Sequence, residues 1–390
     1  MKKISNIVMI LLVFLFLAAG FARTLFLPKT YNYYENRYAN QLTAVGLSQW
    51  LDGSFQDQTE LALNDQVPLA QRLKKGYHIA THRLILTELS SIIKNHPNSY
   101  IRFGNIALFG EDNLCYYPSK LEYNQASLDA KAENLNSRIL ANSDVDFFAY
   151  YIEKDTDIDF TTGTKGGLSE YMMDRLALPE NRKAIYTVDS FETFSDLFYK
   201  TDHHWNYKGS YRAYLQLLDL LEIEDAPLEP VETITLAQPF SGSKASSSET
   251  KDLFQEYFTA YRFDYPEYVC IIDGQPAGEY GNQTAYLDGT LTESISYGAF
   301  YGGDNGEVIL ETGNAERDNL LIIGESYDNA ITELLASHFG TTYNVDLRYY
   351  EATFGTPFRL SEYLSEHQIT KVLLIGNIDY YTLEVFMLGE

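Results

Sequence analysis

The chain opens with one long apolar run that follows two basic residues. Lys2 and Lys3 precede residues 4–22, which are almost entirely apolar. A helix of this length nearly spans a hydrocarbon core, and the basic start predicts a cytosolic amino terminus and export of the rest. The Gly-Phe-Ala sequence at residues 20–22 also fits a cleavage site, so a signal peptide is the alternative. The length of the run favours a retained single-pass anchor over residues 1–27, in the cell membrane.

Residues 28–97 have a different pattern. Up to about residue 60 they are rich in Tyr and Asn and only weakly periodic, whereas apolar positions from Glu60 to Ile93 recur at helical spacing. Pro97 cannot continue a helix. We therefore expect a membrane-proximal connector that is followed by a helical segment.

From residue 98 onward, short apolar runs alternate with helical patterns. The predicted strands cover residues 106–110, 145–152, 184–188, 319–324, 343–347 and 371–375. The predicted helices cover residues 128–140, 168–176, 208–221 and 359–367, and another helical pattern follows residue 326. This alternation predicts an α/β domain over residues 98–390, with a mostly parallel sheet covered by helices on both faces.

Residues 226–315 interrupt this alternation. Pro227, Pro230, a serine-rich stretch at 241–248 and many glycines separate short runs of Tyr, Thr and Ile. Such punctuation is typical of strands joined by long loops. We predict a β-rich insertion in the α/β domain.

The composition of the chain bears on three questions: whether it binds nucleic acid, whether it has a disulfide and whether it has a metal site. The 29 basic and 54 acidic residues give a net charge of −25, which repels nucleic-acid phosphates and argues against a nucleic-acid partner. Cys115 and Cys270 are the two cysteines; export permits a disulfide between them, but buried reduced thiols are the favoured alternative. His78 and His82 share a helix face without the glutamate or third ligand of a zinc site. We predict no metal and no cofactor.

Two distant stretches carry the candidate chemistry. The apolar run at 319–324 ends in a glycine and leads to Ser326, which places this serine on a turn between a strand and a helix. A serine hydroxyl needs a neighbouring base, and that base needs a third group to orient it. His204 and Asp202, two residues apart on a short turn, are suited to these roles.

Each of these residues also has a purely structural interpretation. Ser326 could cap a helix, since serine is a common N-cap residue. A hydrogen bond between Asp202 and His204 could simply hold the turn together. Trp205 is expected to be a packing residue rather than a platform for substrate.

The same residues resemble those of a known family. Asp202-His203-His204-Trp205, followed far downstream by Gly324-Glu325-Ser326, resembles the DHHW family of bacterial cell-envelope proteins, which is related to the SGNH-like alginate O-acetyltransferases. Three further blocks carry the resemblance: Glu35–Arg37, Asp65–Arg72 and Asp346–Tyr350. One departure is Glu325, because typical SGNH enzymes have Asp before the serine.

The resemblance implies a fold and a set of site residues. The fold is an SGNH-hydrolase-like three-layer α/β/α arrangement. Ser326 is the implied nucleophile, His204 the general base and Asp202 the residue that orients it. The remaining candidates for binding substrate or an oxyanion are Arg348, Asn377, His203 and Tyr327.

The resemblance also implies an activity. The expected reaction is O-acetyl transfer, through an acyl-enzyme, to a cell-envelope or secreted polysaccharide. A multi-pass membrane O-acyltransferase is the implied partner that supplies the acyl group. A carbohydrate esterase with the same three residues and a non-catalytic glycan-binding or scaffolding subunit remain as alternatives.

Overall fold

The computed structural model divides the chain into two units, each described here by itself. All residues are described except 1, 33–36, 42–49, 51–53, 67–69, 97, 118–124, 292–294 and 390. Parts of two family-like blocks, residues 35–36 and 67–69, and the helix-ending Pro97 therefore lie outside the described residues. One unit comprises residues 1–95 and 245–254; the other comprises residues 96–244 and 255–390.

The amino-terminal unit is mainly helical. It contains α1 (Lys2–Phe26), α3 (Ser54–Gln66) and α4 (Ala70–Asn95), with a short antiparallel pair of β1 (Tyr31–Asn32) and β2 (Arg37–Tyr38). Among the described residues, no helix is both long and apolar enough to cross a membrane. The membrane anchor at residues 1–27 stays a prediction.

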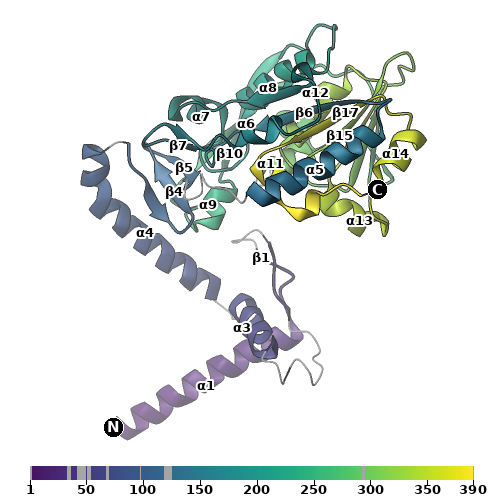
Figure 1. The fold of residues 1–390 in the computed structure, drawn as a ribbon. Helices are drawn as coiled ribbons and strands as arrows, with labels where there is room; N and C mark the ends of the chain where they lie inside the picture. Colours follow the sequence, from purple (N-terminus) through teal and green to yellow (C-terminus); the bar gives the residue numbers. More distant parts are fainter. Residues whose placement is uncertain are drawn as a thin grey trace. The chain divides into compact units, whose positions relative to one another are not determined.

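An eight-stranded sheet forms the centre of the second unit (Figure 1). Its strand order is β13-β12-β14-β16-β15-β17-β6-β9. The five strands from β16 to β9 pair in parallel, and β14, β12 and β13 extend the sheet antiparallel. The strand bounds are β6 Asp146–Ile152, β9 Lys183–Tyr186, β12 Val269–Ile272, β13 Gln275–Ala277, β14 Glu307–Glu311, β15 Asn319–Ile323, β16 Thr341–Val345 and β17 Lys371–Gly376.

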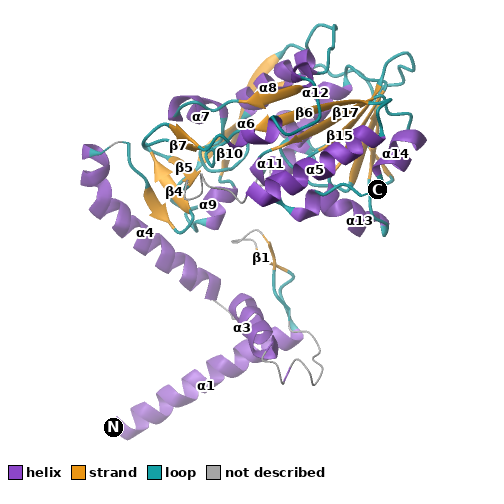
Figure 2. Cartoon of the chain, in the orientation of Figure 1, coloured by secondary structure: helices purple, strands orange, loops and turns teal. Residues whose placement is uncertain are grey.

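Side chains of the central strands alternate between two separate hydrophobic cores. In β15, Leu320 and Ile322 belong to the core that contains residues of α8, whereas Leu321 and Ile323 belong to the core that contains residues of α5 and α14. Both faces of the sheet are therefore covered, and near-continuous apolar strands are typical of this arrangement. The bounds of the main helices are α5 Gln125–Ala141, α6 Leu168–Met173, α7 Phe191–Leu197, α8 Tyr207–Leu220, α12 Thr332–Ala336, α13 Leu347–Phe354, α14 Leu360–Glu366 and α15 Ile378–Thr382. The prediction of an α/β fold with a mostly parallel sheet is confirmed (Figure 2).

The run at residues 106–110 is not a strand of this sheet, contrary to the prediction. It forms β4 (Ile106–Phe109) in a separate antiparallel sheet with β3 (Ile101–Phe103) and β5 (Asn113–Tyr116). Gly104 and Gly110 have φ angles of 72° and 71°, so the chain turns back at both ends of β4. These two tight turns produce hairpins instead of a strand–helix–strand connection.

The segment at residues 226–315 contributes strands to two sheets. β10 (Glu232–Phe240) and β11 (Glu256–Arg262) form an antiparallel pair, and β12 to β14 form the antiparallel edge of the main sheet. Short helices join them: α9 (Ser243–Ser247), α10 (Gln283–Leu287) and α11 (Tyr297–Tyr301). Cys115 and Cys270 are both buried and free, so no disulfide links them.

Candidate active site

Ser326 lies on a tight turn at the carboxyl end of β15. Gly324 permits this turn, because a Cβ there would lie 2.2 Å from Asp328 Oδ2 and 2.8 Å from the Ile375 side chain. The helical pattern predicted after residue 326 forms a 3-10 turn, η2 (Asp328–Ala330), and then the short α12. Asp328 and Thr332 both bond to the Asn344 side chain on β16, which ties this segment to the sheet.

Ser326 is not a helix cap in this structure. The N-cap of η2 is Tyr327, and it makes no side-chain capping bond. The Ser326 hydroxyl instead lies 2.8 Å from His204 Nε2. Ser326 itself is half-buried, whereas Glu325 and Tyr327 on either side of it are buried.

His204 and Asp202 lie on a closed loop before α8. The loop is held by a bridge between Phe198 and Trp205 and by the Tyr199 N–H, which donates to the His204 carbonyl at 3.1 Å. His204 Nδ1 is 2.6 Å from Asp202 Oδ1. With Asp202 ionised, Nδ1–H donates to the carboxylate and Nε2 accepts from the Ser326 hydroxyl. The structure thus brings the three predicted residues together in one hydrogen-bonded chain.

Asp202 is held in place by backbone groups as well as by His204. The His204 N–H donates to Oδ1 at 3.1 Å, and the Ser243 N–H donates to Oδ2 at 2.7 Å. Burial alone would raise the pKa of Asp202, but the His204 imidazole and the Ser243 N–H together hold it well below its usual value. Both oxygens of the buried Asp202 carboxylate therefore accept hydrogen bonds.

Two supports of the site come from residues 226–315, and no sequence pattern predicted either of them. Gly242 packs against Asp202: a Cβ there would lie 2.3 Å from the Asp202 side chain. Tyr297, the first residue of α11, stacks on the His204 ring with centroids 3.7 Å apart and planes 3° apart. Its hydroxyl donates to the Tyr327 carbonyl at 3.2 Å and accepts from Trp205 Nε1 at 3.3 Å. Trp205 is fully buried, as expected of a packing residue.

His203 and Tyr327 lie beside the hydrogen-bonded chain, and each has one side-chain atom that is already hydrogen-bonded. His203 Nδ1 is 2.5 Å from Ser243 Oγ, and its ring centroid is 3.8 Å from that of His204. Burial and the neighbouring His204 lower the pKa of His203 well below its usual value, so it is neutral. The buried Tyr327 hydroxyl donates to the His203 carbonyl, which joins the serine turn to the histidine loop.

Arg348 and Asn377 make no hydrogen bond to Ser326, His204 or Asp202 in the described part of the chain. Arg348 directly follows the predicted strand 343–347, but β16 ends at Val345 and Arg348 lies in the first turn of α13, where Asp346 caps the helix. Its guanidinium forms ion pairs with Asp346 at 2.5 Å and with Asp304 at 3.5 Å, so Arg348 is already paired with carboxylates.

Asn377 instead connects to the residue before Ser326. Its side-chain oxygen caps α15 by accepting from the Asp379 N–H at 2.8 Å. Its backbone N–H donates to Glu325 Oε1 at 2.9 Å. Burial raises the pKa of Glu325, and the Lys154 charge opposes that rise. Glu325 thus links the ends of β15 and β17 beneath the serine turn.

The serine turn also presents backbone donors. Across the described residues, the N–H groups of Ser326 and Tyr327 donate to no acceptor. Unpaired N–H groups next to a nucleophile are the kind of group that stabilises an oxyanion.

Asp202, His203 and His204 also place possible metal-ligand atoms within 4.8 Å of one another. Both ring nitrogens of His204 and both oxygens of Asp202 are already hydrogen-bonded. A metal ion would have to break these bonds, so the donor set fits the hydrogen-bonded chain better than a metal site.

Comparison with known proteins finds similar solved structures but no match by sequence. No family model matches the sequence, and neither does any curated protein. A structure of Bacillus cereus PatB1 with a sulfonyl adduct matches with a TM-score of 0.56 and 17% identity, over 73% of this chain and 97% of PatB1. A DHHW family protein from Eubacterium siraeum matches with a TM-score of 0.50 and 18% identity, over 75% of this chain and 99% of the other. The predicted resemblance is confirmed at the level of the fold, which this chain shares with a DHHW family protein and with PatB1.

Proposed function

We propose that the chain is an extracytoplasmic O-acetyltransferase that modifies a polysaccharide through an acetyl-Ser326 intermediate. The observation that carries this proposal is the unbroken chain from Ser326 Oγ to His204 Nε2 at 2.8 Å and from His204 Nδ1 to Asp202 at 2.6 Å. A nucleophile, a base and a group that orients the base are the requirements of acyl transfer through serine.

The first half-reaction forms the acyl-enzyme. Ser326 Oγ attacks the carbonyl carbon of an acetyl donor while its proton moves to His204 Nε2. Asp202 stabilises the resulting imidazolium, and the N–H groups of Ser326 and Tyr327 stabilise the oxyanion. The bond to the leaving group then breaks, and His204 returns the proton to that group.

The second half-reaction transfers the acetyl group. A sugar hydroxyl attacks the ester carbonyl of acetyl-Ser326 and gives its proton to His204. The bond to Ser326 Oγ breaks, and His204 protonates Oγ to restore the starting state. If water replaces the sugar hydroxyl, the same residues perform ester hydrolysis, which is the esterase alternative.

Two observations favour an enzyme over a non-catalytic binding subunit. A non-catalytic subunit would gain support if Ser326 lay beyond hydrogen-bond reach of His204, and the distance of 2.8 Å counts against it. A PatB1 structure of the same fold carries a sulfonyl adduct. Because sulfonyl reagents modify activated hydroxyl groups, we expect a sulfonyl fluoride to label Ser326.

The amino-terminal run supports the proposed compartment. Two lysines before an apolar stretch favour a cytosolic start and an exported domain. The resemblance to the DHHW family, not this stretch, implies a multi-pass membrane O-acyltransferase as the supplier of acyl groups. Alkaline phosphatase fused after residue 30 should be active in an expression host, because that enzyme needs the disulfides of an oxidising compartment. An inactive but intact fusion would contradict export.

Turnover of a chromogenic acetyl ester tests the activity. We expect Ser326→Ala and His204→Ala to abolish release of the chromophore, while Ser365→Ala, an exposed serine on α14, keeps wild-type turnover. Equal turnover by wild type and Ser326→Ala would contradict the proposal. Mass spectrometry of a glycan acceptor then separates a transferase, which yields acetylated glycan, from an esterase, which yields acetate alone.

A further inference from the structure

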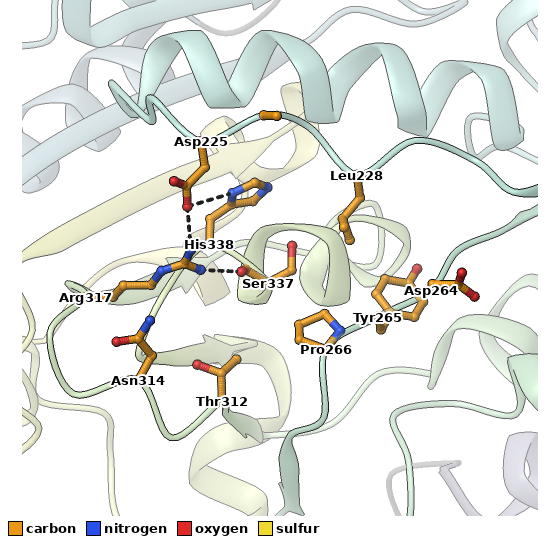
Figure 3. Close-up of a pocket in the computed structure, with 11 residues that line it drawn as sticks. Asp225, Leu228, Asp264, Tyr265, Pro266, Thr312, Asn314, Arg317, Ser337 and His338 are labelled. Atoms are coloured by element: carbon orange, nitrogen blue, oxygen red, sulfur yellow. Dashed lines mark hydrogen bonds and ion pairs between the residues drawn. The ribbon is translucent and has the colours of Figure 1, made fainter.

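A cavity of about 640 Å³ lies in the second unit, away from the serine turn. Its walls come from the loop after α8, residues 264–266 after β11, the loop between β14 and β15, and the end of α12 (Figure 3). This volume is within the range of about 300–1,000 Å³ that is typical of small-molecule sites.

The cavity and the serine turn lie at opposite ends of strand β15. Arg317 lines the cavity just before β15 begins, and Ser326 follows the end of the same strand. Five residues of a strand rise about 16 Å, at roughly 3.3 Å per residue. The cavity is therefore a separate place on the molecule, not an extension of the candidate active site.

One wall of the cavity is mainly apolar and the other is polar. Figure 3 shows Leu228, Tyr265 and Pro266 on one side, and Asp225, Arg317 and Asn314 on the other. A sugar ring has an apolar face and a rim of hydroxyl groups, so such a pair of walls is complementary to it.

His338, in the wall of the cavity, carries a side-chain nitrogen without a hydrogen-bond partner. The Leu228 N–H donates to Tyr214 Oη at 2.8 Å, and Tyr214 Oη lies 2.7 Å from His338 Nε2. The Asp225 carboxylate, 3.7 Å from Nδ1, favours the neutral tautomer with its proton on Nδ1, in which the Tyr214 hydroxyl donates to Nε2. Nδ1 is buried without a hydrogen-bond partner, and Asp225 Oδ2 lies beyond hydrogen-bond reach at 3.7 Å. The His338 side chain as a whole is only 8% exposed.

The charges of the cavity argue against an anionic ligand. The Arg317 guanidinium is neutralised by Asp225 at 2.6 Å and also donates to the Ser337 carbonyl at 2.5 Å. Asp264 adds a further carboxylate to the rim. Without a net positive charge, the cavity offers nothing to balance a phosphate or a uronic acid, whereas carboxylates and amides accept from hydroxyl groups readily.

We propose that this cavity is a second carbohydrate-binding site, for neutral sugar units. It rests on the proposed function in one respect, namely that the sugar units belong to the polysaccharide that is acetylated. Binding part of a long polymer here raises the effective concentration of its other units near Ser326. The site thus selects polymeric over short acceptors.

Isothermal titration calorimetry with the full chain carrying Ser326→Ala tests this site without turnover. The probes are maltohexaose, cellohexaose and chitohexaose, with an oligogalacturonate of the same length as the anionic control. We expect at least one neutral hexasaccharide to bind, and the oligogalacturonate to bind more weakly or not at all. Ester turnover tests the proposed function separately, so the two claims can fail independently.

Two variants assign the binding to the cavity. Asn314→Trp, at an exposed loop position, fills the cavity, and His338→Phe removes the unpaired side-chain donor. Each variant should weaken binding about tenfold, because each loses one hydrogen bond or a comparable set of contacts with the sugar. Asn181→Trp, at an exposed asparagine outside the cavity, should leave binding unchanged. The proposal is overturned if no neutral hexasaccharide binds, if Asn314→Trp binds as well as its parent, or if the oligogalacturonate binds most tightly.

Discussion

The imidazole of His204 lies flat against the phenol ring of Tyr297, with the two planes 3° apart. Its two nitrogens are held by hydrogen bonds with Asp202 and Ser326. The stack on Tyr297 further restricts rotation of the imidazole ring. Tyr297 is far from His204 in sequence, and its own hydroxyl is anchored to the Tyr327 carbonyl. The base is thus oriented by an aromatic face as well as by a carboxylate.

Removing this aromatic face should lower turnover. An aromatic pair of this kind is worth about 0.5–1.5 kcal/mol, so Tyr297→Leu should reduce kcat/KM for a chromogenic acetyl ester by roughly tenfold. Tyr297→Phe keeps the face and should stay within about threefold of wild type. As a positioning residue, Tyr297 should affect kcat and the pH profile more than KM. Equal loss in the leucine and phenylalanine variants would refute a role for the stack.

The charge of Asp202 should matter more than its size. Asp202→Asn removes the acceptor that keeps the proton on His204 Nδ1, so the imidazole can adopt the tautomer that cannot take the Ser326 proton. We expect kcat to fall on the order of a thousandfold, with a melting temperature close to that of wild type. Near-normal turnover by a folded Asp202→Asn variant would show that His204 needs no carboxylate.

The close packing of Gly242 against Asp202 gives a prediction with a matched control. A Cβ at Gly242 would lie 2.3 Å from Asp202, so Gly242→Ala must displace either that side chain or the Ser243 N–H that bonds to it. We expect at least a tenfold loss of kcat, since one displaced hydrogen bond is worth about 1 kcal/mol and misorientation of His204 adds to it.

Gly278→Ala is the control for this change. A Cβ at Gly278 meets nothing within 4 Å, and its φ is not in the left-handed region. This variant should keep both turnover and melting temperature. If the two alanine variants behave alike, packing at Gly242 has no special role.

Sequence patterns predicted the strand–turn that carries Ser326 and the Asp202–His204 pair because each is local. An apolar run that ends in glycine and a carboxylate two residues from a histidine are both visible in a short window. Tyr297 and Gly242 could not be found this way, since their roles depend on how a poorly periodic segment folds back onto the histidine loop. Arg348 was misplaced because Asp346 starts a helix directly after β16, where the pattern suggested that the strand continued.

Glu333 on α12 should make the protein less stable as the pH rises. Burial raises its pKa to about 8, although bonds from Tyr268 and Gln283 oppose the rise. The folded state therefore holds a proton that the unfolded state loses above a pH of roughly 4.5, and stability falls between there and about pH 8. At about 1.4 kcal/mol per pKa unit, the loss amounts to a few kcal/mol.

The variant Glu333→Gln tests that pH dependence by urea unfolding at several pH values. Because glutamine does not titrate, the decline in the free energy of unfolding towards pH 8 should be clearly smaller than in wild type. Glu316→Gln changes an exposed carboxyl and should leave the wild-type decline intact. An unchanged decline in Glu333→Gln would mean that Glu333 is not its source.

Direct capture of the acyl-enzyme is the most direct test of the role of Ser326. The full chain is mixed with a chromogenic acetyl ester, quenched in acid within the first turnover, and examined by intact-mass and peptide mass spectrometry. We predict a mass increase of one acetyl group that maps to Ser326 and is absent from Ser326→Ala. An acetyl group on another residue, or turnover that leaves Ser326 unmodified at every quench time and persists in Ser326→Ala, would contradict the account.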